Sequence, residues 1–354
     1  MKVFKSFALC NLAAVALMCS SCVEDIIETD DIISDDDLPA GVLPSKDFNP
    51  GEFAAEKYSD AAAKYNISDP SSSFSSVELF GDGTYLIISK DVAYQTQSSV
   101  AVAQDVDGGI KVYMPKFQQK ASVSRAYGDY YISGGYIVEQ KGNYVLDDFG
   151  TLKIDENGDG YNLTFDNQNG NRISTVYATK EPAVGDEAAE SLCRAWDVNT
   201  TESWVYLGSV LLSNIKYIGG DVPRYEGLGD DVSEYEIQEA IEESCRKIIF
   251  SPYGTYYCEY NNGTVKVSTW KWANKDQGTL FYDWQIGEND EGYVTVRFAG
   301  NQCRIYEDYT IDLSEYLEED YYYDEDVYYD YIDLFGEDGA MLRLLNVITL
   351  DAAQ

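Results

Sequence analysis

The stretch from residue 250 to residue 309 constrains the fold most. It consists of short runs of Tyr, Trp, Val, Phe and Ile, separated by Asn-Gly, Gln-Gly and Glu-Gly pairs. Such pairs make tight hairpin turns, so the pattern predicts an antiparallel meander. A sheet with an aromatic face must cover both that face and its edges, and closing into a barrel does both.

Strand alternation predicts which side chains share a face, because successive residues of a strand point to opposite sides. Five aromatic residues are expected on the covered face: Tyr256, Trp270, Trp272, Tyr282 and Trp284. The other face carries polar residues, among them Thr255, Glu259 and Lys271. This pattern is typical of a sheet with one side in water.

The amino terminus carries an export signal over residues 1–22. Lys2 and Lys5 precede an apolar stretch, residues 7–18, that is too short to span a bilayer. The segment ends in Ser20-Ser21-Cys22. Residues 23–51 follow as an acidic, Pro- and Gly-interrupted tether. The cysteine at the end of the segment leaves two interpretations: a lipoprotein signal, taken up below, or an ordinary secretory signal with incidental cysteines.

Charge and histidine content exclude several kinds of chemistry. The chain has 62 acidic and 25 basic residues, a formal net charge of −37 and no histidine. A balance this acidic argues against nucleic acid as a partner, because phosphate binding needs clustered Lys and Arg. The lack of histidine removes Ser-His-Asp and Cys-His catalysis and the usual histidine-containing zinc sites.

Four cysteines lie in the part expected to fold: Cys193, Cys245, Cys258 and Cys303. An exported protein can oxidise them, and four cysteines allow three pairings. Cys258 with Cys303 is the disulfide to test first. Free buried thiols are an equal alternative, since reduced cysteine is often buried.

The chain divides into two β domains, residues 52–180 and 187–354. Short helices are expected within 52–64, at 187–192 and at 233–245, the last because Ser233 and Glu236 form a capping box. The motif Phe80-x-x-Gly83-Thr84-Tyr85 recurs with one additional residue as Phe250-x-x-x-Gly254-Thr255-Tyr256. Leu152, Gly160 and Arg172 recur as Trp284, Gly292 and Arg304 at an offset of 132. These recurrences suggest an internal duplication.

The helix, the tryptophan on the following strand and the Gly-Thr-Tyr motif together resemble the lipocalin-like lipoproteins of Bacteroidota. The resemblance implies a mainly β chain with two up-and-down barrels and short helices. The segment ending in Cys22 is similar to a lipoprotein box, which implies lipidation of Cys22, an outer-membrane anchor and exposure at the cell surface. The chain departs from true lipocalins two residues before Trp196, where they have a glycine and this chain has Arg194.

Two acidic segments suggest cation binding. Asp155, Asn157, Asp159 and Asp166 fit the spacing of a calcium loop, the only cofactor that the sequence suggests. Because they fall between two strands, an ordinary hairpin turn is favoured. Residues 315–338 hold eleven acidic residues and seven tyrosines. We expect a solvated insertion there, with a weak divalent-ion surface as the alternative.

Three functions are compatible with these patterns. The favoured one is a membrane-anchored binding module for a small apolar or glycan ligand, lined by the five aromatic residues and not an enzyme. The second is a structural or adhesion component that contacts another envelope protein. The third is a carboxylate-dependent hydrolase, which needs two facing carboxyl groups that sequence cannot locate.

Overall fold

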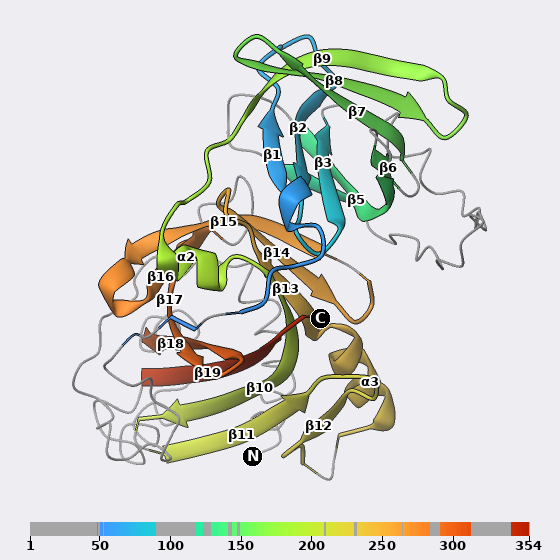
Figure 1. Cartoon of the computed structure of the whole chain (residues 1–354). Coiled ribbons are helices and arrows are strands. Elements are labelled where there is room, and N and C mark those ends of the chain that lie inside the picture. The colour runs from blue at the N-terminus through green and yellow to red at the C-terminus, as the bar shows by residue number, and fades with distance from the viewer. Residues whose placement is uncertain are drawn as a thin grey trace, which may run out of the picture.

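The protein folds into two antiparallel, eight-stranded barrels that pack against each other (Figure 1). The structure is a computed structural model. It describes residues 48, 50–51, 53–89, 118–122, 129–140, 144–146, 149–208, 210–229, 232–263, 265–283, 291–312 and 341–353. The predicted fold class, mainly β with two up-and-down barrels and few short helices, is confirmed.

Barrel 1 is closed by antiparallel pairing of strand β3 (Thr84–Ser89) with strand β5 (Asp129–Gln140). The edge strand β4 (Gln118–Ser122) extends the sheet beside β5 and stands outside the ring. The ring strands are β1 (Ala63–Asn66), β2 (Phe74–Leu79), β3 (Thr84–Ser89), β5 (Asp129–Gln140), β6 (Tyr144–Leu146), β7 (Gly150–Asn157), β8 (Gly160–Asn167) and β9 (Arg172–Lys180).

Barrel 2 is closed by pairing of its first and last strands, β10 with β19. Its ring strands are β10 (Ala195–Leu207), β13 (Cys245–Phe250), β14 (Thr255–Tyr260), β15 (Val265–Asn274), β16 (Thr279–Asp283), β17 (Glu291–Ala299), β18 (Gln302–Asp312) and β19 (Met341–Ala352). Strands β11 (Val210–Ile218) and β12 (Arg224–Glu226) continue the sheet beyond β10.

Helices are short and follow the capping signals. Helix α2 (Glu187–Leu192) lies where predicted, with the Asp186 side chain as its N-cap. Helix α3 (Glu234–Glu242) has the predicted Ser233–Glu236 capping box, although it ends before Cys245, which opens β13. The helix expected within 52–64 is wrong: only a 3₁₀ turn, η2 (Ser59–Ala61), forms there, and Ala63 begins β1.

The two barrels correspond strand for strand, but not in the register that the sequence suggested. Counting around each ring, β2 and β3 match β13 and β14, so the two Gly-Thr-Tyr motifs are equivalent. By the same count β7 matches β17. The offset of 132 instead places Gly160 of β8 on Gly292 of β17, one strand out of step. The offset is therefore not the correspondence between the barrels.

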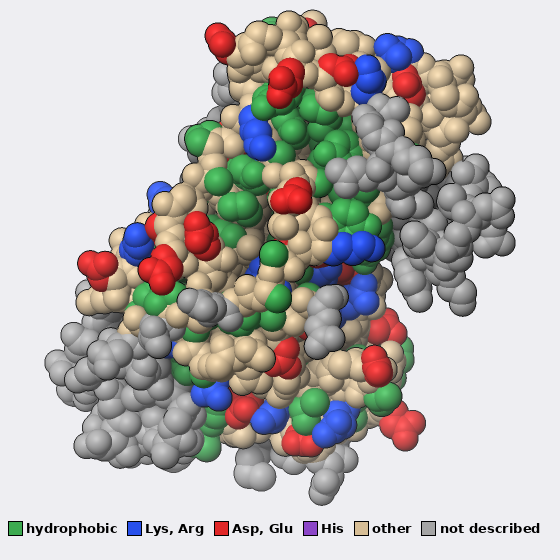
Figure 2. Space-filling model, in the orientation of Figure 1, with side chains coloured by type: hydrophobic (Ala, Val, Ile, Leu, Met, Phe, Trp, Pro, Cys, Tyr) green, Lys and Arg blue, Asp and Glu red, His purple; other side chains and the backbone are tan. Residues whose placement is uncertain are grey.

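Each barrel has its own apolar core. In barrel 1, Phe74 stacks on Phe165 with ring centroids 4.3 Å apart. In barrel 2, the core gathers around Trp196, Phe250 and Trp270. On the face shown in Figure 2, hydrophobic side chains gather over barrel 1, and charged side chains of both signs lie over both barrels. Much of the acidic excess is carried elsewhere, by residues 24–37 and 315–338.

A segment that precedes barrel 1 in the chain packs on barrel 2 (Figure 1). The Phe53 ring meets Trp196 edge to face at a centroid distance of 4.9 Å, and Phe48 packs on Phe298 at 5.7 Å. The Ser191 hydroxyl donates to the Gly51 carbonyl at 2.5 Å. Residues 48, 50, 51 and 53, predicted as tether and start of domain 1, thus cover the end of barrel 2 where α2 lies.

Substituting Gly278 with alanine tests this close packing. Gly278 has φ +66°, and a Cβ there would lie 2.5 Å from the Phe48 ring and 2.7 Å from the Val296 carbonyl. Gly158 has φ +61° and open space around it, so Gly158→Ala isolates the backbone cost. We expect Gly278→Ala to lower the free energy of unfolding by roughly 1–3 kcal/mol more than Gly158→Ala. Equal losses in urea titrations would show that Phe48 does not press on Gly278.

Candidate functional site

The barrels meet through an apolar patch between their outer faces. Phe80 and Leu86 of barrel 1 pack against Ile249, Tyr257 and Val267 of barrel 2. The Phe80 and Tyr257 ring centroids are 5.9 Å apart. The contact joins the β2–β3 hairpin of barrel 1 to β13, β14 and β15 of barrel 2.

This contact corrects the expectation of a wet face on barrel 2. Thr255 and Glu259 do lie on the face opposite Tyr256, as alternation predicts. They are nevertheless 3% and 7% exposed. Barrel 1 covers this part of the face, while Lys271, further along, is exposed as expected.

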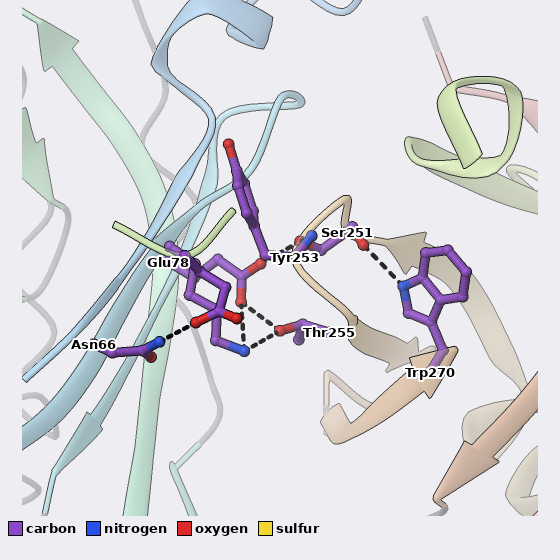
Figure 3. Close-up of polar contacts among 8 residues, drawn as sticks. Asn66, Glu78, Ser251, Tyr253, Thr255 and Trp270 are labelled. Atoms are coloured by element: carbon purple, nitrogen blue, oxygen red, sulfur yellow. Dashed lines mark hydrogen bonds and ion pairs between the residues drawn. The ribbon is translucent and has the colours of Figure 1, made fainter. Parts of the chain in front are cut away.

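A buried carboxylate, Glu78, lies at the centre of the junction (Figure 3). The hydroxyls of Ser251 and Thr255 in barrel 2 both donate to it, Thr255 at 2.5 Å. Lys64 Nζ lies 3.9 Å from the carboxylate and donates to Thr255 Oγ1 at 2.9 Å. One carboxylate of barrel 1 therefore holds both ends of the β13–β14 turn of barrel 2.

Burial is the main influence on Glu78. It raises the pKa of Glu78 above 4.5, against the opposing effects of Lys64 and the two hydroxyl donors. The Tyr253 hydroxyl adds a bond to the Ala62 carbonyl at 2.7 Å. With its hydroxyl partners committed to Glu78, this cluster is suited to fixing the two barrels to each other.

A second charged group flanks the apolar patch. Lys247 of β13 pairs with Asp82 of barrel 1, and Arg246 pairs with Glu259. Burial lowers the pKa of Lys247, but Asp82, Tyr136 and Glu259 together outweigh it and the net shift is upward. Ion pairs and hydroxyl bonds from both barrels thus surround the apolar contact.

Inside barrel 2, the predicted aromatic residues are packed against one another. Trp270 is 3% exposed and its Nε1 donates to the Ser251 carbonyl at 2.8 Å. It meets Phe250 and Trp272 edge to face, at 5.9 and 5.7 Å. Tyr256 lies 5.0 Å from Phe250. The structure therefore brings Tyr256, Trp270 and Trp272 together as core.

Of the other two predicted residues, the structure places only the backbone of Tyr282. Tyr282 stands opposite Trp270 in the strand register, and its side chain is outside the described part. Trp284 lies outside the described residues.

Two polar residues inside barrel 2 escaped the sequence analysis. Glu307 of β18 stands opposite Asn346 of β19, and they are 7% and 2% exposed. Asn346 Nδ2 donates to Glu307 Oε2 at 3.2 Å. The signal was present: Leu342, Leu344, Ile348 and Leu350 make one apolar face by alternation, and Asn346 interrupts it.

The calcium-loop spacing does not bring its residues together. They lie on the β7–β8 hairpin, where Asp155 stands opposite Asn162 and Asp166 opposite Thr151. Asp155 and Asp166 are therefore four ladder positions apart, roughly 13 Å at strand rise. Asn157 and Asp159 are at the turn, and Asp166 pairs with Arg172 at 2.5 Å. Among the described residues, no group of three or more His, Cys, Asp or Glu side chains is placed to hold a metal ion.

The predicted disulfide is absent from the structure. Cys193, Cys245, Cys258 and Cys303 are all free thiols. Cys258 on β14 and Cys303 on β18 are four strands apart in a ring of eight, on opposite walls. Opposite sheets are roughly 10 Å apart, whereas a disulfide needs Cα atoms within about 7 Å. Burial raises the pKa of Cys303, which keeps it a neutral thiol.

Several predicted features lie outside the described residues: Cys22, the tether before residue 48 and the acidic segment 315–338. In the described part, none of the helices combines the length and apolar character that a membrane span requires. Comparison of the chain with protein-family models, with curated proteins and with solved structures found no match.

Proposed function

We propose that the protein is a binding module, anchored to the outer membrane through Cys22 and exposed at the cell surface, that holds a small ligand inside barrel 2. The buried pair of Glu307 and Asn346 in the mainly apolar interior of barrel 2 carries the proposal. Binding sites of this kind combine an apolar lining with a few convergent polar groups.

The two ends of barrel 2 differ in a way that supports this placement. The end near α2 is filled: Ala189 and Leu192 pack under Trp196, and Phe53 covers the outside. Glu307 and Asn346 lie toward the other end, where β18 leads into residues 313–340. The proposed ligand contacts this polar pair and not the packed rings at the α2 end.

The ring packing favours an apolar ligand over a glycan. Sugar binding uses exposed aromatic faces as stacking platforms, and the described rings of Trp270 and Phe250 are instead in contact with each other. The described interior of barrel 2 therefore offers apolar surface together with a few polar side chains, among them Glu307, Asn346 and Ser268.

A matched set of probes tests the proposal by thermal unfolding. The set is 2-phenylethylamine, 2-phenylethanol, ethylbenzene and 3-phenylpropanoate. We expect at least one probe to raise Tm with increasing concentration. At a probe concentration one hundred times Kd, the free energy of unfolding should rise by about 2.7 kcal/mol. Tryptophan emission should change with the same midpoint, because Trp270 and Trp272 lie in the same core. No shift with any probe would contradict a ligand site in barrel 2.

A further inference from the structure

A polar layer crosses the interior of barrel 2 between two apolar layers. Glu307 shares its face of β18 with Cys303 and Ile305, which belong to the main core. On β19, Asn346 lies between Ile348 on the core side and Leu344 on the other side. Leu344 packs with Val205 and Leu342 in a separate apolar cluster.

The two polar atoms of the Asn346 amide differ in their hydrogen bonding. Its Nδ2 donates to Glu307. Its Oδ1 is buried and has no hydrogen-bond partner among the residues that the structure describes. A buried acceptor without a donor is costly, and leucine at this position would continue the face of Leu344 and Ile348 without that cost. Asn346 Oδ1 can therefore receive a hydrogen-bond donor that the described residues do not supply.

The wall opposite the polar layer is aromatic. Tyr256 of β14 stands four strands from β18 around the ring. Burial raises the pKa of Tyr256 well above 10, with Cys258, Cys245 and Glu307 contributing, so Glu307 acts on it across the interior. Tyr256 is held by Phe250 on one side. An apolar body would thus meet a neutral aromatic wall, and its polar end would meet Glu307 and Asn346.

We propose that barrel 2 selects an apolar or aromatic ligand that ends in an N–H donor, best an ammonium group, received by Asn346 Oδ1 and Glu307. This inference rests on the proposed function and names its ligand class. Charge agrees with it, since Glu307 and the net charge of −37 both disfavour an anionic head group. Hydrogen bonds that involve an ion pair are stronger than neutral ones, so the amine should lead the probe series.

The test measures the affinity of the four probes for the full chain and three variants by isothermal titration. Glu307→Gln keeps the shape and removes the charge. Asn346→Leu removes the acceptor. Asp308→Asn is the matched control, because Asp308 is the next residue of β18, points outward and pairs with Arg343. Circular dichroism and Tm establish that each variant folds.

We expect 2-phenylethylamine to bind roughly tenfold more tightly than ethylbenzene, and 3-phenylpropanoate to bind most weakly. Glu307→Gln should weaken the amine roughly tenfold and leave ethylbenzene unchanged. Asn346→Leu should weaken the amine and the alcohol, raise Tm and spare ethylbenzene. Asp308→Asn should change none of them.

Two results would overturn the inference. If ethylbenzene binds as tightly as the amine and Glu307→Gln has no effect, the ligand class is wrong while the proposed binding function stands. If no probe binds and a crystal structure shows an ordered water alone at Asn346 Oδ1, both the ligand class and the binding function fall.

Discussion

Replacing Glu78 with alanine is expected to lower the free energy of unfolding by about 3–5 kcal/mol, because the change leaves buried partners uncompensated. Lys64, whose side chain is 19% exposed, would lose its carboxylate. Ser251 and Thr255 would lose the acceptor that both share. Urea unfolding followed by far-ultraviolet circular dichroism measures the loss.

Two controls give this loss its meaning. Glu78→Gln keeps an acceptor for one hydroxyl and should cost less than alanine. Glu202→Ala breaks an ion pair with Lys216 whose side chains are about one-third exposed, and should cost at most about 1 kcal/mol. If Glu78→Ala costs no more than Glu202→Ala, Glu78 does not hold the barrels together.

The pH dependence of the same variants has a defined sign. Burial raises the pKa of Glu78 in the folded protein, so folded Glu78 holds a proton more tightly than the unfolded chain does. The folded state therefore gains relative to the unfolded state as pH falls through the window above 4.5. Glu78→Gln does not titrate. Wild type should gain stability relative to Glu78→Gln on acidification from pH 7 to pH 5, and a relative loss would mean that the anion is the stabilised form.

Replacing Trp196 with alanine should have an effect of similar size, a loss of about 3–5 kcal/mol. The indole is 0% exposed. Its Nε1 donates to the Leu192 carbonyl at 2.9 Å, which ties α2 to β10. Its ring also supports Phe53. The substitution should therefore loosen the segment 48–53 as well as destabilise barrel 2.

Limited proteolysis separates the two consequences of Trp196→Ala. Cleavage near Phe53 should become faster than global unfolding predicts, because that ring loses its packing surface. Trp196→Phe retains most of the packing and removes the hydrogen bond, so it should cost about 1–2 kcal/mol. Tyr235→Ala, at a residue 75% exposed on α3, should fall within about 0.5 kcal/mol of wild type. Unchanged cleavage at Phe53 would contradict the packing role of Trp196.

Local patterns in the sequence predicted the strands well. Asn-Gly and Gln-Gly turns and two-residue alternation predicted the meander of residues 250–309, which contains β14 to β17 and most of β18, because hairpin geometry depends on neighbouring residues. The capping signals placed α2 and α3 for the same reason. The Ala-rich stretch before residue 64 failed, because Ala61 and Ala63 are buried against barrel 1 and tertiary packing overrides helix propensity.

The site depended on contacts that no local pattern contains. Thr255 and Glu259 read as solvent-facing because the sequence does not show that barrel 1 covers them. Cys258 and Cys303 are both core residues, but only the ring order reveals that they stand on opposite walls. Glu307 and Asn346 were readable as polar interruptions of apolar faces, although their pairing required the β18–β19 register.

The path of the chain through residues 48–56 determines how the molecule would bear mechanical force. Glu56 accepts from the backbone N–H of Ala195, and Phe53 rests on Trp196, before the chain enters β1. A pull on the amino terminus would act first on these attachments at the start of β10. Barrel 1 would bear the force only after Phe48 and Phe53 had detached from barrel 2. These contacts would therefore protect barrel 1 from forces applied at the amino terminus.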